Sequence, residues 1–167
     1  MAISATELAR ELGELLVAQE AQLCLAESLT GGCLAATVTS VPASGQWFSA
    51  SFVTYGMEQK TKLLDVPWGL LQDTGPVTAE VVTHMVQNAQ AKTGSPYGLA
   101  VSGVAGPSGG TKDCPVGTVW FAWAHGPRVW TNKQVFEGDR DSIRAQTVIE
   151  GLKGLINVAK DLRPTLG

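Results

Sequence analysis

The alternation of amphipathic helices with short buried strands constrains the fold of this chain most strongly. Apolar residues recur at helical spacing in three long segments, and short apolar runs between them end in polar or glycine-rich stretches. The last two predicted strands follow one another directly and indicate an antiparallel hairpin. The pattern therefore predicts an α/β three-layer sandwich, with helices on both faces of a mixed, mostly parallel sheet.

Local signals mark the ends of the longest predicted helices. Ser4 and Glu7 form a capping box at the start of the first helix. Thr78 caps a second long helix that Gly94 ends, and a last helix begins near Asp139. The strands are expected at residues 23–26, 48–55, 97–104, 117–124 and 129–136, with shorter helices from about 33 to 41 and around 60–64.

Length and charge exclude several classes of protein. The 167 residues, 44% of them hydrophobic, suit a single domain over residues 1–167. No apolar run approaches the roughly 20 residues that span a bilayer, and the first residues lack the features of a secretory signal. A net charge of −3 provides no general basic surface for nucleic acid. We therefore expect neither a membrane nor a nucleic acid as partner.

The cysteines and histidines argue against disulfides and metal. Cys24, Cys33 and Cys114 form an odd set without a CxxC pair, which fits a reducing, cytoplasmic location. His84 and His125 have no ligand-like spacing to one another or to the cysteines, so no metal site is expected.

Polar, glycine-rich segments follow three predicted strands, at residues 27–32, 55–60 and 102–110. Ligands gather at such strand ends in open α/β sheets. Ser28 lies between a buried strand and a helix opened by Gly31 and Gly32, whose backbone N–H groups can stabilise an oxyanion. The alternative is that Ser28 or Thr30 merely caps the helix.

A serine nucleophile needs a base, and neither histidine is well placed. Lys60 follows a strand end, and desolvation can lower the pKa of a lysine toward neutrality. Tyr55, five residues earlier, can orient Lys60 or shuttle a proton. The alternative is that Lys60 is an ordinary solvated surface lysine.

Two further segments suit a nucleotide. Residues 102–110 match neither a dinucleotide fingerprint nor a P-loop, but such a loop can wrap a nucleotide or simply lie on the surface. Arg140 is expected at a helix start that suits a phosphate. It can instead pair with Asp141 or Glu137 at the surface.

Taken together, these segments resemble the CinA C-terminal domain family, the nicotinamide mononucleotide amidohydrolases. The matching stretches are 26–32, 47–48, 52–55, Lys60, 102–107, 109–110, 115–120 and 138–140. They occur in order over nearly the whole chain.

The resemblance implies hydrolysis of the carboxamide of nicotinamide mononucleotide to nicotinate mononucleotide and ammonia, a step of pyridine nucleotide salvage. It also implies an α/β sandwich without metal or cofactor, and a cytoplasmic homo-oligomer, a dimer or larger. Ser28 matches the proposed nucleophile, Lys60 the general base and Tyr55 the neighbouring site tyrosine. Substrate contacts are expected at Thr30, Gly31, Gly32, Gly103, Ala105, Gly106 and Arg140.

Two positions depart from the family pattern. Gly56 and Met57 follow Tyr55, where the family usually has a small residue and then Asn, and Met57 cannot cap a helix. Cys114 stands where the family favours a basic residue. Two hypotheses therefore remain: a serine-lysine amidohydrolase, or a catalytically weak relative that binds a nucleotide as a regulatory or scaffolding module.

Tryptophans near the late strands bear on self-association. Trp120 and Trp123 have opposite parity in one strand, so at least one leaves the core face, and Trp130 lies in the next strand. Such a side chain is covered either by a helix or by a second copy of the chain. The family resemblance favours a homodimer.

Overall fold

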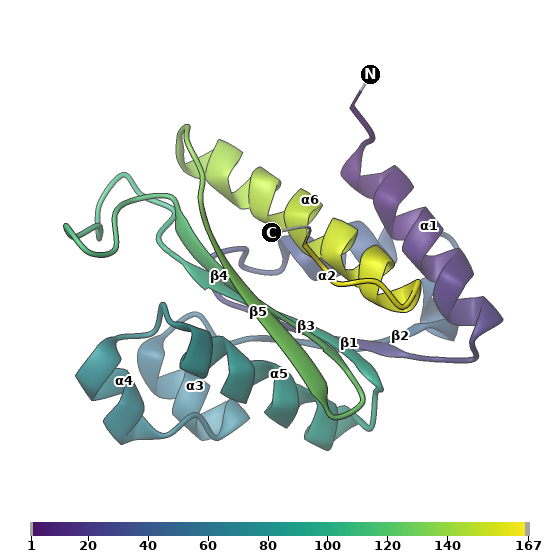
Figure 1. Cartoon of the computed structure of the whole chain (residues 1–167), viewed down its shortest axis with the longest axis horizontal. Coiled ribbons are helices and arrows are strands. Elements are labelled where there is room, and N and C mark those ends of the chain that lie inside the picture. The colour runs from purple at the N-terminus through teal and green to yellow at the C-terminus, as the bar shows by residue number, and fades with distance from the viewer. Residues whose placement is uncertain (1, 166–167) are drawn as a thin grey trace.

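The computed structural model describes residues 2–165. Met1 and residues 166–167, the outermost positions of the expected domain, lie outside the described part. The centre of the domain is a five-stranded sheet in the order β2-β1-β3-β4-β5 (Figure 1). The strands are β1 (Leu23–Glu27), β2 (Phe48–Val53), β3 (Tyr97–Gly103), β4 (Thr118–His125) and β5 (Arg128–Val135).

The strand directions confirm a mixed, mostly parallel sheet. β1 pairs in parallel with both β2 and β3, whereas β4 pairs antiparallel with β3 and with β5. Consequently β4 alone runs against the other four strands. The predicted hairpin is the β4–β5 pair.

Helices cover both faces of the sheet and complete three layers (Figure 1). One face carries α1 (Ala5–Ala18), α2 (Cys33–Thr39) and α6 (Arg140–Ala159), and the other carries α3 (Met57–Leu64), α4 (Trp68–Thr74) and α5 (Ala79–Thr93). A 3₁₀ turn, η1 (Ser44–Gln46), precedes β2. Each face of the sheet has its own apolar core, so burial on two sides holds the sheet in place.

The predicted helix ends are confirmed. The Ser4 hydroxyl accepts the Glu7 N–H, and the Glu7 carboxylate accepts the Ser4 N–H in return. Thr78 caps α5, and Gly94 ends it with a left-handed φ of +74°. Asp139 caps α6 by accepting the Ser142 N–H. The sequence did not predict α4, because Leu71 is its only buried residue and one residue creates no apolar periodicity.

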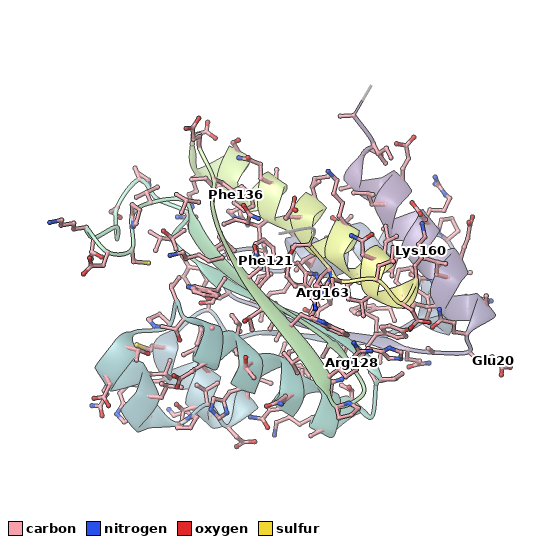
Figure 2. The ribbon with its side chains drawn as sticks, viewed as in Figure 1. Glu20, Phe121, Arg128, Phe136, Lys160 and Arg163 are labelled. Atoms are coloured by element: carbon pink, nitrogen blue, oxygen red, sulfur yellow. The ribbon has the colours of Figure 1, made fainter. Side chains whose placement is uncertain are left out.

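The tryptophans of β4 face opposite sides of the sheet, and helices cover both sides. Trp123 is fully buried under α6, where its indole donates to the Gly151 carbonyl over 2.9 Å. Trp120 is partly buried against the core formed with α5. Helix coverage therefore explains both side chains. Figure 2 shows Phe121 and Phe136 on the α6 side, with their rings edge to face at 6.2 Å.

Two absences hold within residues 2–165. No helix there has the length and apolar character to cross a membrane. No group of three histidine, cysteine or acidic side chains in this range comes together in a way that could hold a metal ion.

Candidate active site

A pocket of about 470 Å³ opens where β1 and β3 end and β4 begins. The segments that the sequence singled out as strand exits meet here, together with the start of α6. The pocket is lined by Ser28, Leu29, Tyr55, Thr74, Gly75, Pro76, Val77, Gly103, Val104, Ala105, Gly106, Ser108, Gly109, Thr111, Cys114 and Arg140.

A serine of the pocket lining is in direct contact with a buried lysine behind it. Lys60 Nζ lies 2.9 Å from Ser28 Oγ, although the two residues are 32 positions apart. Lys60 is 1% exposed, which excludes the alternative of a solvated surface lysine. Ser28 is 7% exposed and lines the pocket. The serine oxygen therefore faces the pocket with the ammonium group directly behind it.

Burial sets the acidity of this lysine. Desolvation lowers the pKa of Lys60 from 10.5 to about 8, because the charged form loses the water that would solvate it. Within residues 2–165, no carboxylate forms an ion pair with Lys60; its other partners are the carbonyl oxygens of Thr54, at 2.5 Å, and Tyr55, at 3.3 Å. These contacts hold Nζ in place while a substantial fraction of the side chain is neutral near pH 8.

Parallel pairing of β1 and β2 brings the two residues together. Glu27 is paired with Val53, and the Thr54 N–H donates to the Glu27 carbonyl at 3.0 Å, so both chains leave the sheet side by side. The helix α3 then begins at Met57 and places Lys60 in its first turn. The N-cap position is Gly56, not residue 57 as expected, and it provides no side-chain cap, yet α3 forms and Lys60 reaches Ser28.

Glu27 is a residue beside the site that the sequence analysis did not single out. Its side chain is fully buried, and its carboxylate accepts hydrogen bonds of 2.7–3.2 Å from the N–H groups of Gly32, Leu34 and Ala35 and from the hydroxyls of Thr30 and Ser51. These bonds tie the segment after Ser28, residues 28–32, to the start of α2. The signal was an acidic residue inside an otherwise apolar strand, LCLAE.

The segment 28–32, here called the nucleophile loop, differs from the expectation in its details. Neither Ser28 nor Thr30 caps α2; Gly32 occupies the N-cap position. Gly31 and Gly32 adopt left-handed φ values of +56° and +102° that form the sharp turn. Their N–H groups already donate to the Ser28 carbonyl and to Glu27. Thr30, Gly31 and Gly32 thus shape the loop and do not line the pocket.

Arg144 is the second residue that the sequence did not reveal. From α6, its Nε donates to the Leu29 carbonyl at 2.9 Å and its Nη2 donates to the Thr30 carbonyl at 3.2 Å. Leu29 lies 115 positions away, so no local pattern connects the two residues. By contrast, the N–H groups of Leu29 and Thr30 have no acceptor among residues 2–165.

Arg140 lies one helical turn before Arg144 and reaches the pocket itself. Its Nη1 donates to the Gly106 carbonyl at 2.7 Å, and its Nη2 donates to the Tyr55 hydroxyl at 3.2 Å. The predicted alternative of an ion pair with Asp141 or Glu137 is absent from the described residues. Arg140 is thus a guanidinium without an acidic partner at the edge of the pocket.

Tyr55 takes a different position from the one expected. Lys60 contacts only its backbone carbonyl, while the phenol, on a side chain that is 60% exposed, is held by Arg140. The phenol therefore does not orient the lysine in this structure.

The opposite wall of the pocket is built from backbone. The predicted residues Gly103, Ala105 and Gly106 line it, and a Cβ at Gly103 would come within 2.7 Å of the Thr118 carbonyl oxygen. Residues 74–77, from the last residue of α4 into the loop before α5, also line it and were missed. A hydrogen bond of 2.9 Å from the Ser102 hydroxyl to the Pro76 carbonyl holds this segment against β3. The Gly-Pro break in residues 75–76 was the available signal.

Comparison with known proteins gives a consistent result. The profile of the CinA C-terminal domain matches residues 5–159. The nicotinamide-nucleotide amidohydrolase PncC of Pseudomonas putida is 49% identical over 156 residues, covering 93% of this chain and 98% of its own. PncC of Escherichia coli K12 is 38% identical over 151 residues, covering 89% and 91%.

Solved structures agree with the sequence relatives. A CinA superfamily protein from Klebsiella pneumoniae superposes with a TM-score of 0.92 at 31% identity, covering 95% of this chain and 99% of the other. A competence damage-inducible protein A from the same species gives a TM-score of 0.90 at 34% identity, covering 92% and 96%. With a family match over most of its length and close relatives of nearly equal extent, this chain belongs to the CinA C-terminal domain family.

Proposed function

We propose that this protein hydrolyses the carboxamide of nicotinamide mononucleotide to nicotinate mononucleotide and ammonia, as a step of pyridine nucleotide salvage. The observation that carries the proposal is the 2.9 Å contact between Ser28 Oγ, in the pocket lining, and Lys60 Nζ, buried behind it. The names of the similar proteins from Pseudomonas putida and Escherichia coli point to the same reaction.

The contact suggests a serine-lysine mechanism. Neutral Lys60 takes the hydroxyl proton as Ser28 Oγ attacks the carboxamide carbon, and the carbonyl oxygen becomes an oxyanion. Lys60 then gives its proton to the departing amine, which leaves as ammonia, and the acyl group remains as an ester on Ser28. Water attacks this ester with Lys60 again as base. Nicotinate mononucleotide leaves, and Ser28 regains its proton.

The oxyanion needs donors that are free in the resting enzyme. The N–H groups of Gly31 and Gly32 already have partners, and Thr30 is fully buried outside the pocket lining, so we place the donor at the Leu29 N–H. Leu29 lines the pocket beside Ser28. Preorganised backbone donors of this kind stabilise an oxyanion without reorganising during the reaction.

An ammonia-release assay with nicotinamide mononucleotide tests the reaction. Ser28→Ala and Lys60→Arg should each lower kcat by about 10³-fold or more, and the double variant should lose little beyond either single one. Arginine fails as a base because its guanidinium stays protonated near neutral pH. Lys62→Arg is the matched control, since Lys62 is exposed and pairs with Glu58 at 3.6 Å. Near-normal turnover by Ser28→Ala would refute the mechanism.

The same assay decides the second candidate, a nucleotide-binding module without turnover. Cys114 in the pocket lining favours this candidate, because the family prefers a basic residue there. A parent protein that binds nicotinamide mononucleotide in calorimetry but releases no ammonia would be such a module.

We propose further that Arg140 binds the phosphate of the nucleotide. It stands at the start of α6, lines the pocket and has no acidic partner among the described residues. A guanidinium beside a helix N-terminus suits an anion. Arg140→Ala should raise KM for the nucleotide at least about tenfold, with a smaller change in kcat, and added inorganic phosphate should inhibit the parent more than the variant. Equal KM values would leave the phosphate to the loop at residues 103–110.

Assembly and location complete the proposal. β5 forms an edge of the sheet, so the outer side of its backbone can pair with a second copy, and we propose a homodimer. The described structure leaves Cys24, Cys33 and Cys114 as free thiols, which suits the reducing cytoplasm.

A further inference from the structure

Arg144 holds two carbonyl groups of the nucleophile loop from behind. From α6 it donates to the Leu29 and Thr30 carbonyls, and it lines a separate, smaller pocket that shares no lining residue with the substrate pocket. It therefore cannot be assigned as a substrate ligand. Its contacts nevertheless fall on the residues that directly follow Ser28.

The geometry of a peptide unit gives these contacts a consequence. The Leu29 carbonyl and the Thr30 N–H belong to one peptide, which is trans, so the two groups point in opposite directions. Since Arg144 fixes the carbonyl toward α6, the Thr30 N–H must point away from α6. Likewise, the Ser28 carbonyl accepts the Gly31 N–H at 3.1 Å, which fixes the orientation of the Leu29 N–H.

Both N–H groups are thus aimed by anchors on their own carbonyls. They have no acceptor among residues 2–165, although Thr30 is fully buried and Leu29 is 3% exposed. Buried backbone N–H groups almost always have a partner, and an orphan next to a nucleophile calls for a functional explanation.

We infer that Arg144 is a positioning residue for the oxyanion hole: by anchoring the Leu29 and Thr30 carbonyls, it holds the nucleophile loop so that the Leu29 N–H, beside Ser28 in the pocket lining, faces the oxyanion. The inference rests on the proposed serine-lysine hydrolysis and adds the residue that orients its electrostatic component. Removing one oxyanion-hole donor typically lowers kcat about 10²–10³-fold, so a donor that is present but wrongly oriented should lower kcat about 10–10²-fold.

Arg144→Met tests this inference by removing the hydrogen bonds to the Leu29 and Thr30 carbonyls, together with the one to Cys33 Sγ, while keeping a long side chain. We expect kcat to fall about 10–10²-fold with KM within about threefold, because the oxyanion exists only in the transition state. Pyridine-3-boronic acid, which forms a tetrahedral adduct on a serine oxygen, should bind more weakly by a similar factor. Nicotinate mononucleotide, a ground-state ligand, should bind within about threefold of its parent affinity.

Controls separate positioning from stability. Lys153→Met removes an exposed cation from the same helix and should leave kcat and both affinities unchanged. Arg144→Lys keeps the charge but lacks the fork that reaches two carbonyls, so it should retain part of the activity. If Arg144→Met does not fold, the same measurements on Arg144→Lys decide, with a loss of boronate affinity expected and product affinity retained.

Two outcomes would overturn the inference. One is a folded variant with kcat within twofold of the parent, and the other is equal weakening of the boronate and of nicotinate mononucleotide. Failure of the proposed function is distinguishable from both, because there the parent itself releases no ammonia. In that case the boronate affinities of the parent and of Arg144→Met, compared with their affinities for nicotinate mononucleotide, still test whether Arg144 positions the loop beside Ser28.

Discussion

The buried side chain of Lys60 sets the pH range in which we expect the site to be active. A lysine acts as a base only after losing its proton, and burial lowers its pKa to about 8. The rate of ammonia release should therefore rise about tenfold per pH unit below pH 8 and level off above it. Rates measured in buffers from pH 6 to pH 10 test this expectation. A flat profile over pH 6–9 would assign the base to another group.

The same shift makes stability depend on pH. Between about pH 8 and pH 10.5 the unfolded chain holds a proton on Lys60 that the folded chain has released, so the free energy of unfolding rises with pH through this window. Burial raises the pKa of Cys24 to about 11, which has the opposite sign above pH 9. Urea unfolding of the parent and of Lys60→Met separates the two groups. The difference between the two proteins should shift in favour of the parent as pH rises, and a constant difference would contradict the shift.

At the scale of elements, α6 joins the site to the core. Its first turns carry Arg140 and Arg144. Its later turns pack on Trp123 at Gly154, where an added Cβ would lie 2.2 Å from the indole. Gly154→Ala should therefore destabilise the fold by about 1–3 kcal/mol through overpacking. Gly69→Ala in α4, where nothing lies within 4 Å of the added Cβ, is the matched control and should be neutral or slightly stabilising. Equal melting temperatures for the two variants would contradict this packing argument.

The elements also show what could be predicted from sequence. Local signals sufficed for α5 and α6, because Thr78 and Asp139 cap their own helices. Ser28 and Lys60 were found from strand ends and from the family resemblance. Glu27 was overlooked although four of its partners lie within eight residues, because a single acidic residue at the end of an apolar strand leaves no periodic pattern. Arg144 escaped because its partners, Leu29 and Thr30, lie more than 100 positions away and only the folded chain brings them near. For the same reason the phenol of Tyr55 was paired with the wrong residue.

At the scale of the whole molecule, the outer edge of β5 is the test of assembly. Pairing of this edge with a second copy would extend the sheet across two chains. Light scattering on the purified protein at micromolar concentration should give twice the mass of the 17.5 kDa chain. The substitution Asn132→Pro, in the middle of β5, should shift the mass toward that of one chain if β5 is the interface. A single-chain mass for the parent would contradict the homodimer.

The parallel pairing of β1 with β2 also has a consequence for how the protein becomes active. Ser28 and Lys60 meet only after the chain between them has crossed over and β2 has docked beside β1. Parallel contacts between distant segments are among the slow steps of folding, whereas helices such as α5 form from neighbouring residues. During refolding from urea, ellipticity should thus recover before ammonia release does. The return of ammonia release during refolding therefore reports when β2 has paired with β1.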